Sequence, residues 1–364
     1  MTLRLAIVLP TRDERDNIAP LVERIAAALG SSGWEVLFVD DDSPDGTADA
    51  ARALALTDPR VRVIQRIGRR GLASAAIEGM LATAAPYVAV MDADHQHDPA
   101  LLPAMLEPVA SGAADIAVAS RFAPGGSAAG LSSASREQGS RIANGLARRL
   151  TGVELADPMS GFFLLPTATA RQLAPSLSGI GFKILLDLLA TTPSPLRVIE
   201  VPMQFAQRRS GASKLDRAVA LDFLVGLYDK TLGRIIPTRF ALFGTVGAAG
   251  VLVHMAVLAA LYPGATKLFW QAQSVATIGA MTFNFWLNNW LTYRDRRLSG
   301  WRALLRGWLG FCLTCLVGAF ANVAAASWLQ ARGVDWRLAA LAGIALGSVW
   351  NFALSSRFVW GRYR

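Results

Sequence analysis

The sequence predicts an α/β domain with a mostly parallel sheet, followed by a helical membrane domain. Short strand patterns alternate with helical ones as far as Ser120, and this alternation is typical of a parallel sheet with right-handed crossovers. Beyond about Pro237, long apolar runs dominate the sequence. The 364 residues suffice for two or more domains, and with 53% hydrophobic and 17% charged residues the chain is apolar for a soluble protein.

The N-terminal half supplies the predicted strands and helices of the sheet. Leu3–Leu9 is a strand that we expect Pro10 to end, and it is too short for a membrane span and lacks a signal-peptide cleavage site. A helix follows from Asn17 to Leu29, with apolar residues at helical spacing and Gly30 behind it. Later strands are predicted over Val36–Val39, Val61–Gln65, Tyr87–Met91, Ile116–Ala119 and Arg197–Phe205. Later helices are predicted after Gly71, over Pro99–Val109 and, as an amphipathic helix, over Gly181–Ala190.

Acidic residues follow two of these strands. Asp40 and Asp41 come directly after the second strand, and Asp92 and Asp94 come directly after the fourth. We expect both clusters at the carboxyl edge of the sheet, where open α/β sheets bind ligands. Asp40 and Asp41 are suited to accept hydrogen bonds from a nucleobase or from ribose hydroxyls.

The D-x-D pair suggests a metal site. Two neighbouring carboxylates repel each other, and both stay ionised more easily if a divalent cation lies between them and a polyphosphate. Gln96 adds a neutral oxygen of the kind that Mg²⁺ or Mn²⁺ accepts. The alternative for a D-x-D pair by itself is an acidic turn, closed here by Asp98 and Pro99.

Cationic residues recur in glycine-rich segments of the same half. Arg69, Arg70 and Gly71 precede a predicted helix, where main-chain N–H groups and positive charge favour phosphate, although a surface loop is also often basic. The segment RRSGASK, from Arg208 to Lys214, is suited to close on phosphate groups as a flexible loop.

The domain boundaries follow from these patterns. We place a catalytic domain at residues 1–214, a linker with amphipathic helices at 215–237, and a transmembrane domain at 238–364. The linker is compatible with packing on the catalytic domain, but its position just before the apolar runs favours the membrane interface.

Four apolar runs of the last domain are long enough to cross about 30 Å of hydrocarbon at about 1.5 Å per residue. They lie at about 240–262, 268–293, 307–329 and 338–360. Lys and Arg residues border them unequally, with eleven on the side of the N-terminal domain and three in the other two loops. This asymmetry predicts a plasma-membrane protein whose catalytic domain and both termini are cytoplasmic.

Polar residues occur inside the predicted spans. Asn284 and Asn288 share a helix face, and Asn322 and Asn351 also lie at depth. Hydrogen bonding between helices is the simpler explanation, and a lining for a polar head group is the functional one. Cys312 and Cys315 have no second cysteine pair or histidine cluster, so we interpret them as small apolar residues of one helix.

The motifs together resemble a known family. Their order in the chain is LPTRDERDNI, VDDDSPDGT, GLASA, MDADHQHDP, SRFAPGG, DPMSGFF, GFKILLDLLA, EVPMQFAQRRSGASK and NNWLTYRDRRL. A chain with these motifs resembles a family-2 glycosyltransferase of the polyprenol/dolichol-phosphate mannose synthase type, fused to a GtrA-like domain of four membrane spans. The resemblance covers nearly the whole chain and implies a GT-A type, Rossmann-like fold for the first domain.

The resemblance also implies roles for individual residues. The residues that would hold the guanosine of GDP-mannose are Pro10, Glu14, Asp40 and Asp41. The ligands of Mg²⁺ or Mn²⁺ would be Asp92, Asp94 and Gln96. The residues that would contact donor or acceptor phosphates are Arg121, Arg136, Arg208 and Lys214, with Ser213 supporting the last loop. The candidate catalytic residues are Asp94, Arg121, Arg208 and Lys214, and Asp157 lies in the acceptor-side turn.

Several positions depart from the family pattern. Arg12 and Asp13 stand where the family usually has Tyr-Asn, and Phe163 replaces an arginine of some relatives. Either Arg136 or Arg141 matches the family's arginine, and His95 stands at a usually apolar position and is not counted as a ligand.

The function implied by the resemblance is inverting transfer of mannose from GDP-mannose to a polyprenyl phosphate at the bilayer. Two alternatives stay open at this point: a related transferase that uses a UDP-sugar, and a lipid-linked-sugar transporter with a non-catalytic nucleotide domain. The first half has no basic stripe with interleaved aromatic residues, so nucleic-acid binding is not expected.

Overall fold

The computed structural model describes residues 2–69, 71–127, 153–177, 184–192, 194–206, 235–261 and 269–361, with the isolated positions Gly145, Val225, Tyr228 and Gly233. The chain divides into two compact units, Met1–Thr231 and Leu232–Arg364. Each unit is described by itself below.

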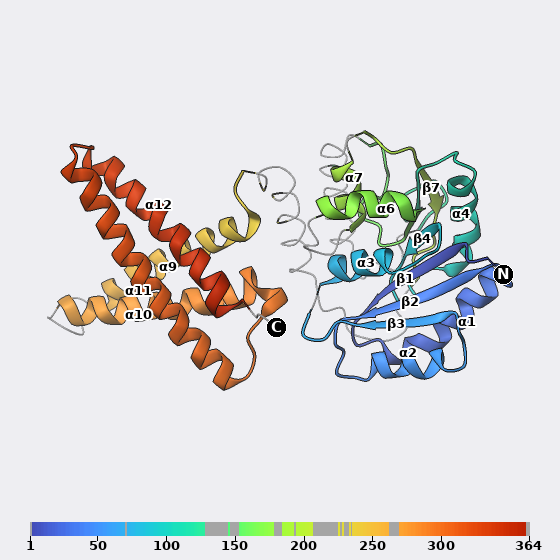
Figure 1. Ribbon diagram of the computed structural model, residues 1–364, viewed down its shortest axis with the longest axis horizontal. Helices are drawn as coiled ribbons and strands as arrows, with labels where there is room; N and C mark the ends of the chain where they lie inside the picture. Colours follow the sequence, from blue (N-terminus) through green and yellow to red (C-terminus); the bar gives the residue numbers. More distant parts are fainter. Residues whose placement is uncertain are drawn as a thin grey trace. The chain divides into compact units, whose positions relative to one another are not determined.

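A seven-stranded sheet with the order β3-β2-β1-β4-β6-β5-β7 forms the centre of the N-terminal unit (Figure 1). The strands are β1 (Leu5–Thr11), β2 (Trp34–Asp40), β3 (Val61–Gln65), β4 (Tyr87–Val90), β5 (Ile116–Ser120), β6 (Phe163–Pro166) and β7 (Val198–Pro202). All neighbouring pairs are parallel except those of β6, which runs antiparallel between β4 and β5. The predicted mostly parallel sheet is therefore confirmed.

Helices cover both faces of this sheet. They are α1 (Ile18–Leu29), α2 (Thr47–Ala55), α3 (Leu72–Leu81), α4 (Leu102–Ala110), α6 (Thr167–Leu173) and α7 (Ile184–Thr191), with short 3₁₀ turns at Arg15–Asn17, Pro99–Leu101 and Ala174–Ser176. Alternate strand residues point to opposite faces, so β1 contributes Leu5, Ile7 and Leu9 to one hydrophobic cluster and Ala6 and Val8 to the other.

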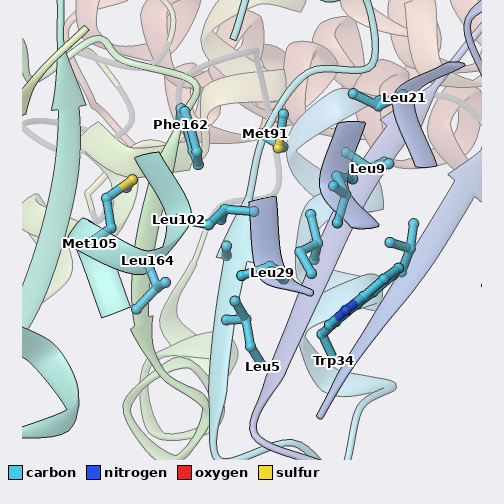
Figure 2. Packing of buried hydrophobic residues seen from close by; sticks show 14 of the residues in the cluster. Leu5, Leu9, Leu21, Leu29, Trp34, Met91, Leu102, Met105, Phe162 and Leu164 are labelled. Atoms are coloured by element: carbon cyan, nitrogen blue, oxygen red, sulfur yellow. The ribbon is translucent and has the colours of Figure 1, made fainter. Parts of the chain in front are cut away.

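The first cluster lies under α1, α2 and α4, and the second lies under α3, α6 and α7. Figure 2 shows part of the first cluster, where Trp34, Leu102 and Phe162 come from three separate parts of the chain. A sheet covered on both faces needs nearly continuous apolar strands, and β2 is buried at all seven of its positions. This double burial explains why the strands were recognisable as short apolar runs.

Two sequence expectations about elements are corrected by the structure, and one strand was not expected. Strand β1 does not end at Pro10 but continues to Thr11, because its pairing with β4 stops at Val8 and the missing proline N–H is not needed there. Helix α7 is not amphipathic, since all six residues from Ile184 to Leu189 are buried. Strand β6 was not predicted, because four apolar residues after a turn carry no signal for their pairing partner.

The C-terminal unit is helical. Its long helices in the described residues are α9 (Thr238–Leu261), α10 (Phe269–Leu287), α11 (Trp301–Ala331) and α12 (Trp336–Leu354). α10 and α12 each continue into one π-helical turn, Asn288–Thr292 and Ser355–Val359, and a 3₁₀ turn follows at Arg294–Arg296. Two described helices, α9 and the Trp301–Ala321 part of α11, are long and apolar enough to cross a membrane.

Candidate functional site

The strand register brings the predicted site residues to one edge of the sheet. Thr11 is level with Asp40 in the β1–β2 pair, and Val8 is level with Val90 in the β1–β4 pair. The segments that follow β2, β1 and β4 therefore leave the sheet side by side. Because β6 runs antiparallel, its amino end lies at this edge too, with Phe163 level with both Val90 and Val118. The edge thus joins the residues after the six parallel strands with the turn before β6.

The D-x-D turn presents two carboxylates with different surroundings. The Asp92 side chain is 39% exposed, whereas Asp94 is buried and its Oδ1 accepts the main-chain N–H of Gln96 at 3.1 Å. The Gln96 side-chain amide donates to the Ala206 carbonyl at 3.1 Å, and the Ala206 N–H donates back to the Gln96 carbonyl at 3.2 Å. Gln96 therefore ties the turn after β4 to the segment after β7.

The residues of this turn fit a hard divalent cation. Two carboxylates and an amide are oxygen donors, which Mg²⁺ and Mn²⁺ prefer. Over the described part of the chain, no group of three or more His, Cys, Asp and Glu residues is arranged to hold a metal ion by itself. Mg²⁺ sites commonly combine one or two carboxylates with other oxygen ligands, so these three side chains are suited to such an ion.

Two histidines of the same turn are buried, and neither was predicted to take part. His95 has a positive φ of 66°, and its Nδ1 lies 3.2 Å from Nη1 of Arg24, which also binds Asp98 at 3.2 Å. His97 accepts the main-chain N–H of Asp92 on its Nδ1 at 3.0 Å. No local pattern indicates these contacts, because the partners of a buried histidine are set by the fold.

Asp40 organises the end of β2 and is fully buried. One of its oxygens accepts the Ser43 N–H at 2.9 Å, and the other accepts the Ser43 hydroxyl at 2.5 Å and the Thr11 hydroxyl at 3.3 Å. These bonds join the ends of β1 and β2 and satisfy a carboxylate that burial would otherwise penalise. Asp40 therefore shapes the predicted base-binding corner from behind.

Asp41 is paired with an arginine that sequence reasoning missed. Arg66, directly after β3, is buried and binds Asp41 through Nη1 at 2.5 Å. The other Asp41 oxygen accepts the Gly71 N–H at 2.6 Å, and Arg66 also reaches the Ser74 hydroxyl at 2.6 Å and Glu78 at 3.2 Å. This network fixes the start of α3 against the end of β2. Its only sequence signal is a cation that directly follows an apolar strand.

The remaining predicted nucleoside contacts lie beside Asp40. Pro10 is half-buried near the end of β1. Glu14 accepts the Asn17 side-chain amide at 2.5 Å, and its N–H donates to the Thr47 hydroxyl at 2.9 Å. Asp45 supports the same corner: burial alone raises its pKa, but hydrogen bonds from Thr47 and from the Arg15 N–H outweigh this, so the pKa lies below its usual value of 3.8.

Arg121, a predicted phosphate contact, forms a buried ion pair with Asp157. Its Nε and Nη2 donate to the two Asp157 oxygens at 2.7 and 2.8 Å, and its main-chain N–H donates to Oδ2 at 3.1 Å. The guanidinium lies 5.4 Å from the ring centre of Phe205. Glu200 holds the turn that contains Asp157, because its carboxylate accepts the main-chain N–H groups of Ala156 and Asp157. The pair thus fixes the guanidinium plane at the edge of the sheet.

Several predicted residues cannot be placed. Arg136, Arg141, Arg208, Ser213 and Lys214 lie outside the described residues. The phosphate-closing loop and the choice between Arg136 and Arg141 therefore stay predictions.

Comparison with known proteins follows the same division of the chain. The model of Glycosyl transferase family 2 matches residues 6–173, and that of the GtrA/DPMS transmembrane domain matches residues 242–360. The dolichol-phosphate mannosyltransferase of Pyrococcus furiosus is 33% identical, over 98% of this chain and 99% of the relative. The chain belongs to the dolichol-phosphate mannosyltransferase family.

Two further relatives match a part of this chain. The dolichol-phosphate mannosyltransferase of Saccharomyces cerevisiae is 34% identical over 67% of this chain and 93% of its own length. The polyprenol monophosphomannose synthase of Mycolicibacterium smegmatis is 35% identical over 59% of this chain and 82% of its own length. The family resemblance recognised from the motifs is confirmed: the chain is a glycosyltransferase with a GtrA/DPMS transmembrane domain, and hence a membrane protein.

Proposed function

We propose that the protein transfers mannose from GDP-mannose to a polyprenyl phosphate, with a bound Mg²⁺ or Mn²⁺. The observation that carries this proposal is the match to the Pyrococcus furiosus mannosyltransferase along the whole of both chains. The site geometry supports it, because acidic residues after β2 and β4 meet at one edge of the sheet, beside a buried Arg121–Asp157 pair.

The chain's own residues would divide the binding of the donor between two corners. The ends of β1 and β2 would hold the nucleoside, with Pro10 and Glu14 beside it and the buried Asp40 and Asp41 supporting the corner from behind. Asp92 and Asp94, with Gln96, would hold the cation against the diphosphate. When bound, this cation would neutralise the charge that develops on the departing nucleoside diphosphate.

Arginine and lysine side chains would bring two anions together. A polyprenyl phosphate is already an anion at neutral pH, so its attack needs no strong general base. Arg121 has Nε and Nη2 committed to Asp157, so we assign phosphate contact to the remaining edge of its guanidinium. Arg136, Arg208 and Lys214 would complete the clamp, with Ser213 supporting it. Positioning of this kind lowers the barrier by holding the reacting groups in line, and attack from the side opposite the leaving group would invert the anomeric centre.

The membrane unit would serve the lipid acceptor. We propose that all four long helices cross the plasma membrane and that the N-terminal unit lies on the cytoplasmic side, where eleven of the flanking Lys and Arg residues are counted against three. This arrangement places the strand-end site on the side from which a nucleotide sugar is supplied.

The test is a donor panel with the purified full chain in lipid nanodiscs. GDP-mannose, GDP-glucose, UDP-glucose and UDP-galactose, each labelled in the sugar, are supplied with polyprenyl phosphate and Mn²⁺. We expect labelled lipid from GDP-mannose alone, and none after chelation by EDTA. Asp94→Asn should abolish the product, whereas Asp98→Asn, in the same turn but bound to Arg24, should retain it. Product from a UDP-sugar would replace the proposed donor, and no product from any donor would favour a non-catalytic nucleotide domain.

A further inference from the structure

His97 occupies the inside of the D-x-D turn. It is buried, and its Nδ1 accepts the main-chain N–H of Asp92 at 3.0 Å while lying 3.8 Å from Oδ2 of the same residue. His97 lies five residues after Asp92, so its side chain spans the turn that carries Asp94. The bond gives the N–H of Asp92 an acceptor that no strand supplies at this point, since β4 ends at Val90.

The surroundings hold the His97 ring in place. Its centre lies 5.5 Å from that of Phe162, before β6, and 5.7 Å from that of Phe205, after β7. A Cβ placed on Gly161 would lie 3.2 Å from Cε1 of His97 and 3.1 Å from Oδ2 of Asp92. The ring therefore sits in a fitted space formed by three separate segments, and Gly161 leaves room for both the ring and the Asp92 carboxylate.

We propose that His97 is a positioning residue for the divalent cation, which it serves by fixing the backbone and carboxylate of Asp92. This rests on the proposed metal site. Groups that orient a metal ligand typically change metal affinity by about 10–100-fold when they are removed. The contact that matters is the acceptor at the δ position of the side chain, because the Asp92 N–H points there.

Asparagine and glutamine separate this contact from the loss of the ring. His97→Asn keeps an oxygen at the δ position, and His97→Gln moves its polar atoms to the ε position, while both lose the packing on Phe162 and Phe205. Mn²⁺ binding is measured on the full chain in detergent by the electron paramagnetic resonance signal of free Mn²⁺, with and without GDP. We expect His97→Gln to weaken Mn²⁺ binding by about tenfold, and His97→Asn to bind at least several times more tightly than His97→Gln at the same thermal midpoint.

A second variant protects the test against misfolding. Gly161→Ala, which retains the His97 side chain, should weaken Mn²⁺ binding, because the added methyl crowds both the Asp92 carboxylate and the His97 ring. Equal Mn²⁺ affinity for His97→Asn and His97→Gln, or unchanged affinity in Gly161→Ala, would overturn the proposal. Because this readout is metal binding, a failure of mannosyl transfer in the unaltered protein would not be mistaken for a failure of His97.

In the C-terminal unit, the helix pairs α9–α10 and α11–α12 share a sequence pattern. Asn-Phe at Asn284 recurs 67 positions later at Asn351, and Phe243 and Gly250 recur 68 positions later as Phe311 and Gly318. The π-helical turns at Asn288–Thr292 and Ser355–Val359 also lie 67 positions apart. The pair α9–α10 thus matches the pair α11–α12.

The contacts between the pairs are reciprocal. Phe285 of the first pair lies 6.0 Å from Phe311 of the second, and its counterpart Phe352 lies 5.7 Å from Phe243 of the first. Tyr293 and its counterpart Trp360 stack on each other with ring centres 4.2 Å apart. When residue i of one copy meets j of the other and j meets i in return, the interface has the form of a two-fold contact.

The reciprocity extends to hydrogen bonds at the ends of α10 and α12. The Tyr293 hydroxyl bonds to the Ser356 hydroxyl at 2.5 Å, and the Trp360 Nε1 donates to Asn289 at 3.0 Å. Asn289 and Ser356 are themselves counterparts, 67 positions apart.

The same symmetry relates two half-buried asparagines. A Cβ on Gly250 would lie 2.2 Å from Oδ1 of Asn284, and a Cβ on Gly318 would lie 1.8 Å from Oδ1 of Asn351. Both oxygens are buried and have no conventional hydrogen-bond partner in the described part of the chain. Each carboxamide therefore lies directly on the glycine of its paired helix, where a Cα–H group is the available donor. This contact replaces the hydrogen bonding between helices that the sequence suggested for Asn284 and Asn351.

We infer that the C-terminal unit is a tandem repeat of one helix hairpin, with a glycine–asparagine clasp inside each copy. A copy with two membrane-crossing helices ends on the side where it began, so both copies have the same orientation, as in repeats related by an axis along the membrane normal. The π-helical ends of α10 and α12 then lie on one side of the membrane. α10 and α12 would then cross it just as α9 and α11 do, although among the described helices only α9 and part of α11 are by themselves long and apolar enough to do so.

Paired substitutions test the two clasps in the full chain. Gly250→Ala and Gly318→Ala should each lower the thermal midpoint of the detergent-solubilised protein by similar amounts, because each methyl meets a carboxamide. Asn284→Ala should restore Gly250→Ala but not Gly318→Ala, and Asn351→Ala should restore only Gly318→Ala. If a glycine-to-alanine variant does not accumulate in the membrane, the matching asparagine-to-alanine substitution should restore its accumulation, and this outcome supports the proposal equally. Tolerance of one glycine substitution but not the other, or rescue by the wrong asparagine, would refute the repeat.

Discussion

Burial of the Arg121–Asp157 pair is the feature whose energetic effect can be worked out most directly. The same arrangement occurs a second time, in Arg197 and Asp115, where the main-chain N–H, Nε and Nη2 of the arginine donate to one carboxylate at 2.8, 3.1 and 2.7 Å. The side chains of Arg121 and Asp157 are 10% and 0% exposed, whereas those of Arg197 and Asp115 are 62% and 34% exposed. The two pairs differ in solvent exposure while their hydrogen bonds match, so they form a natural control.

The substitution Asp157→Asn removes one charge and leaves Arg121 buried with an amide. Breaking a buried pair in this way costs about 3–5 kcal/mol, and in a unit of this size each kcal/mol lowers the melting temperature by about 2–4 °C. The expected loss is about 6–20 °C, toward the lower end because the amide oxygen still accepts a hydrogen bond. Asp115→Asn should shift the melting temperature several times less, because water screens and solvates the exposed pair.

The assay is thermal unfolding of the full chain in detergent, followed by intrinsic fluorescence. Equal shifts for Asp157→Asn and Asp115→Asn would refute the reasoning that burial sets the cost. The double variant Asp157→Asn with Arg121→Gln should lose less than the sum of the two single losses, since neither buried partner is then left charged. A double variant whose loss equals that sum would show that the two side chains are not energetically coupled.

Four further outcomes are expected. Gly79→Ala should destabilise the N-terminal unit by about 1–3 kcal/mol, because the added Cβ would lie 2.3 Å from Cγ1 of Val8, and Val8→Ala should lower the thermal midpoint less in the Gly79→Ala protein than in the unaltered protein. Arg66→Met should weaken GDP binding, measured by calorimetry, more than it lowers the turnover number, because it releases the Asp41 carboxylate and the start of α3 behind the nucleoside corner. A change in the turnover number alone would contradict this. The pKa of Asp45 is lowered in the folded protein, so the ionised carboxylate stabilises the fold at pH values above 3.8, and this contribution is lost as the pH falls below 3.8. The thermal midpoints of the unaltered protein and of Asp45→Asn should therefore differ at neutral pH and converge below pH 3.8. Removal of divalent cations should stop mannolipid formation reversibly, with activity restored by Mn²⁺, and activity that survives exhaustive chelation would exclude a metal-dependent reaction.

Much of the site could be located from the sequence because it follows strand ends. Asp40 and Asp92 come directly after apolar runs that are buried on both faces, and such runs mark strands without reference to any other part of the chain. Parallel strands bring their carboxyl ends to one edge, so the meeting of the two acidic clusters followed from topology alone. The length of the apolar runs after about Pro237 likewise indicated long helices, which the structure contains.

The ion pairs of the site could not be predicted, because they join segments that are distant in the chain. Arg66 reaches Asp41 across 25 positions, and Arg121 reaches Asp157 across 36. No local pattern of apolar and polar residues encodes such a choice, which depends on how the strands are ordered. The antiparallel strand β6 is an example: its insertion between β4 and β5 sets where Asp157 and Gly161 lie.

The sequence by itself therefore determined the two-part architecture, the alternating strands and helices, and the acidic strand ends, since these depend on local periodicity and composition. The tertiary structure alone decided which charges are neutralised inside the fold, which histidine supports Asp92, and which glycine faces which asparagine. The physical reason is that burial and hydrogen bonding are properties of contacts, and most of the decisive contacts form between residues far apart in the chain.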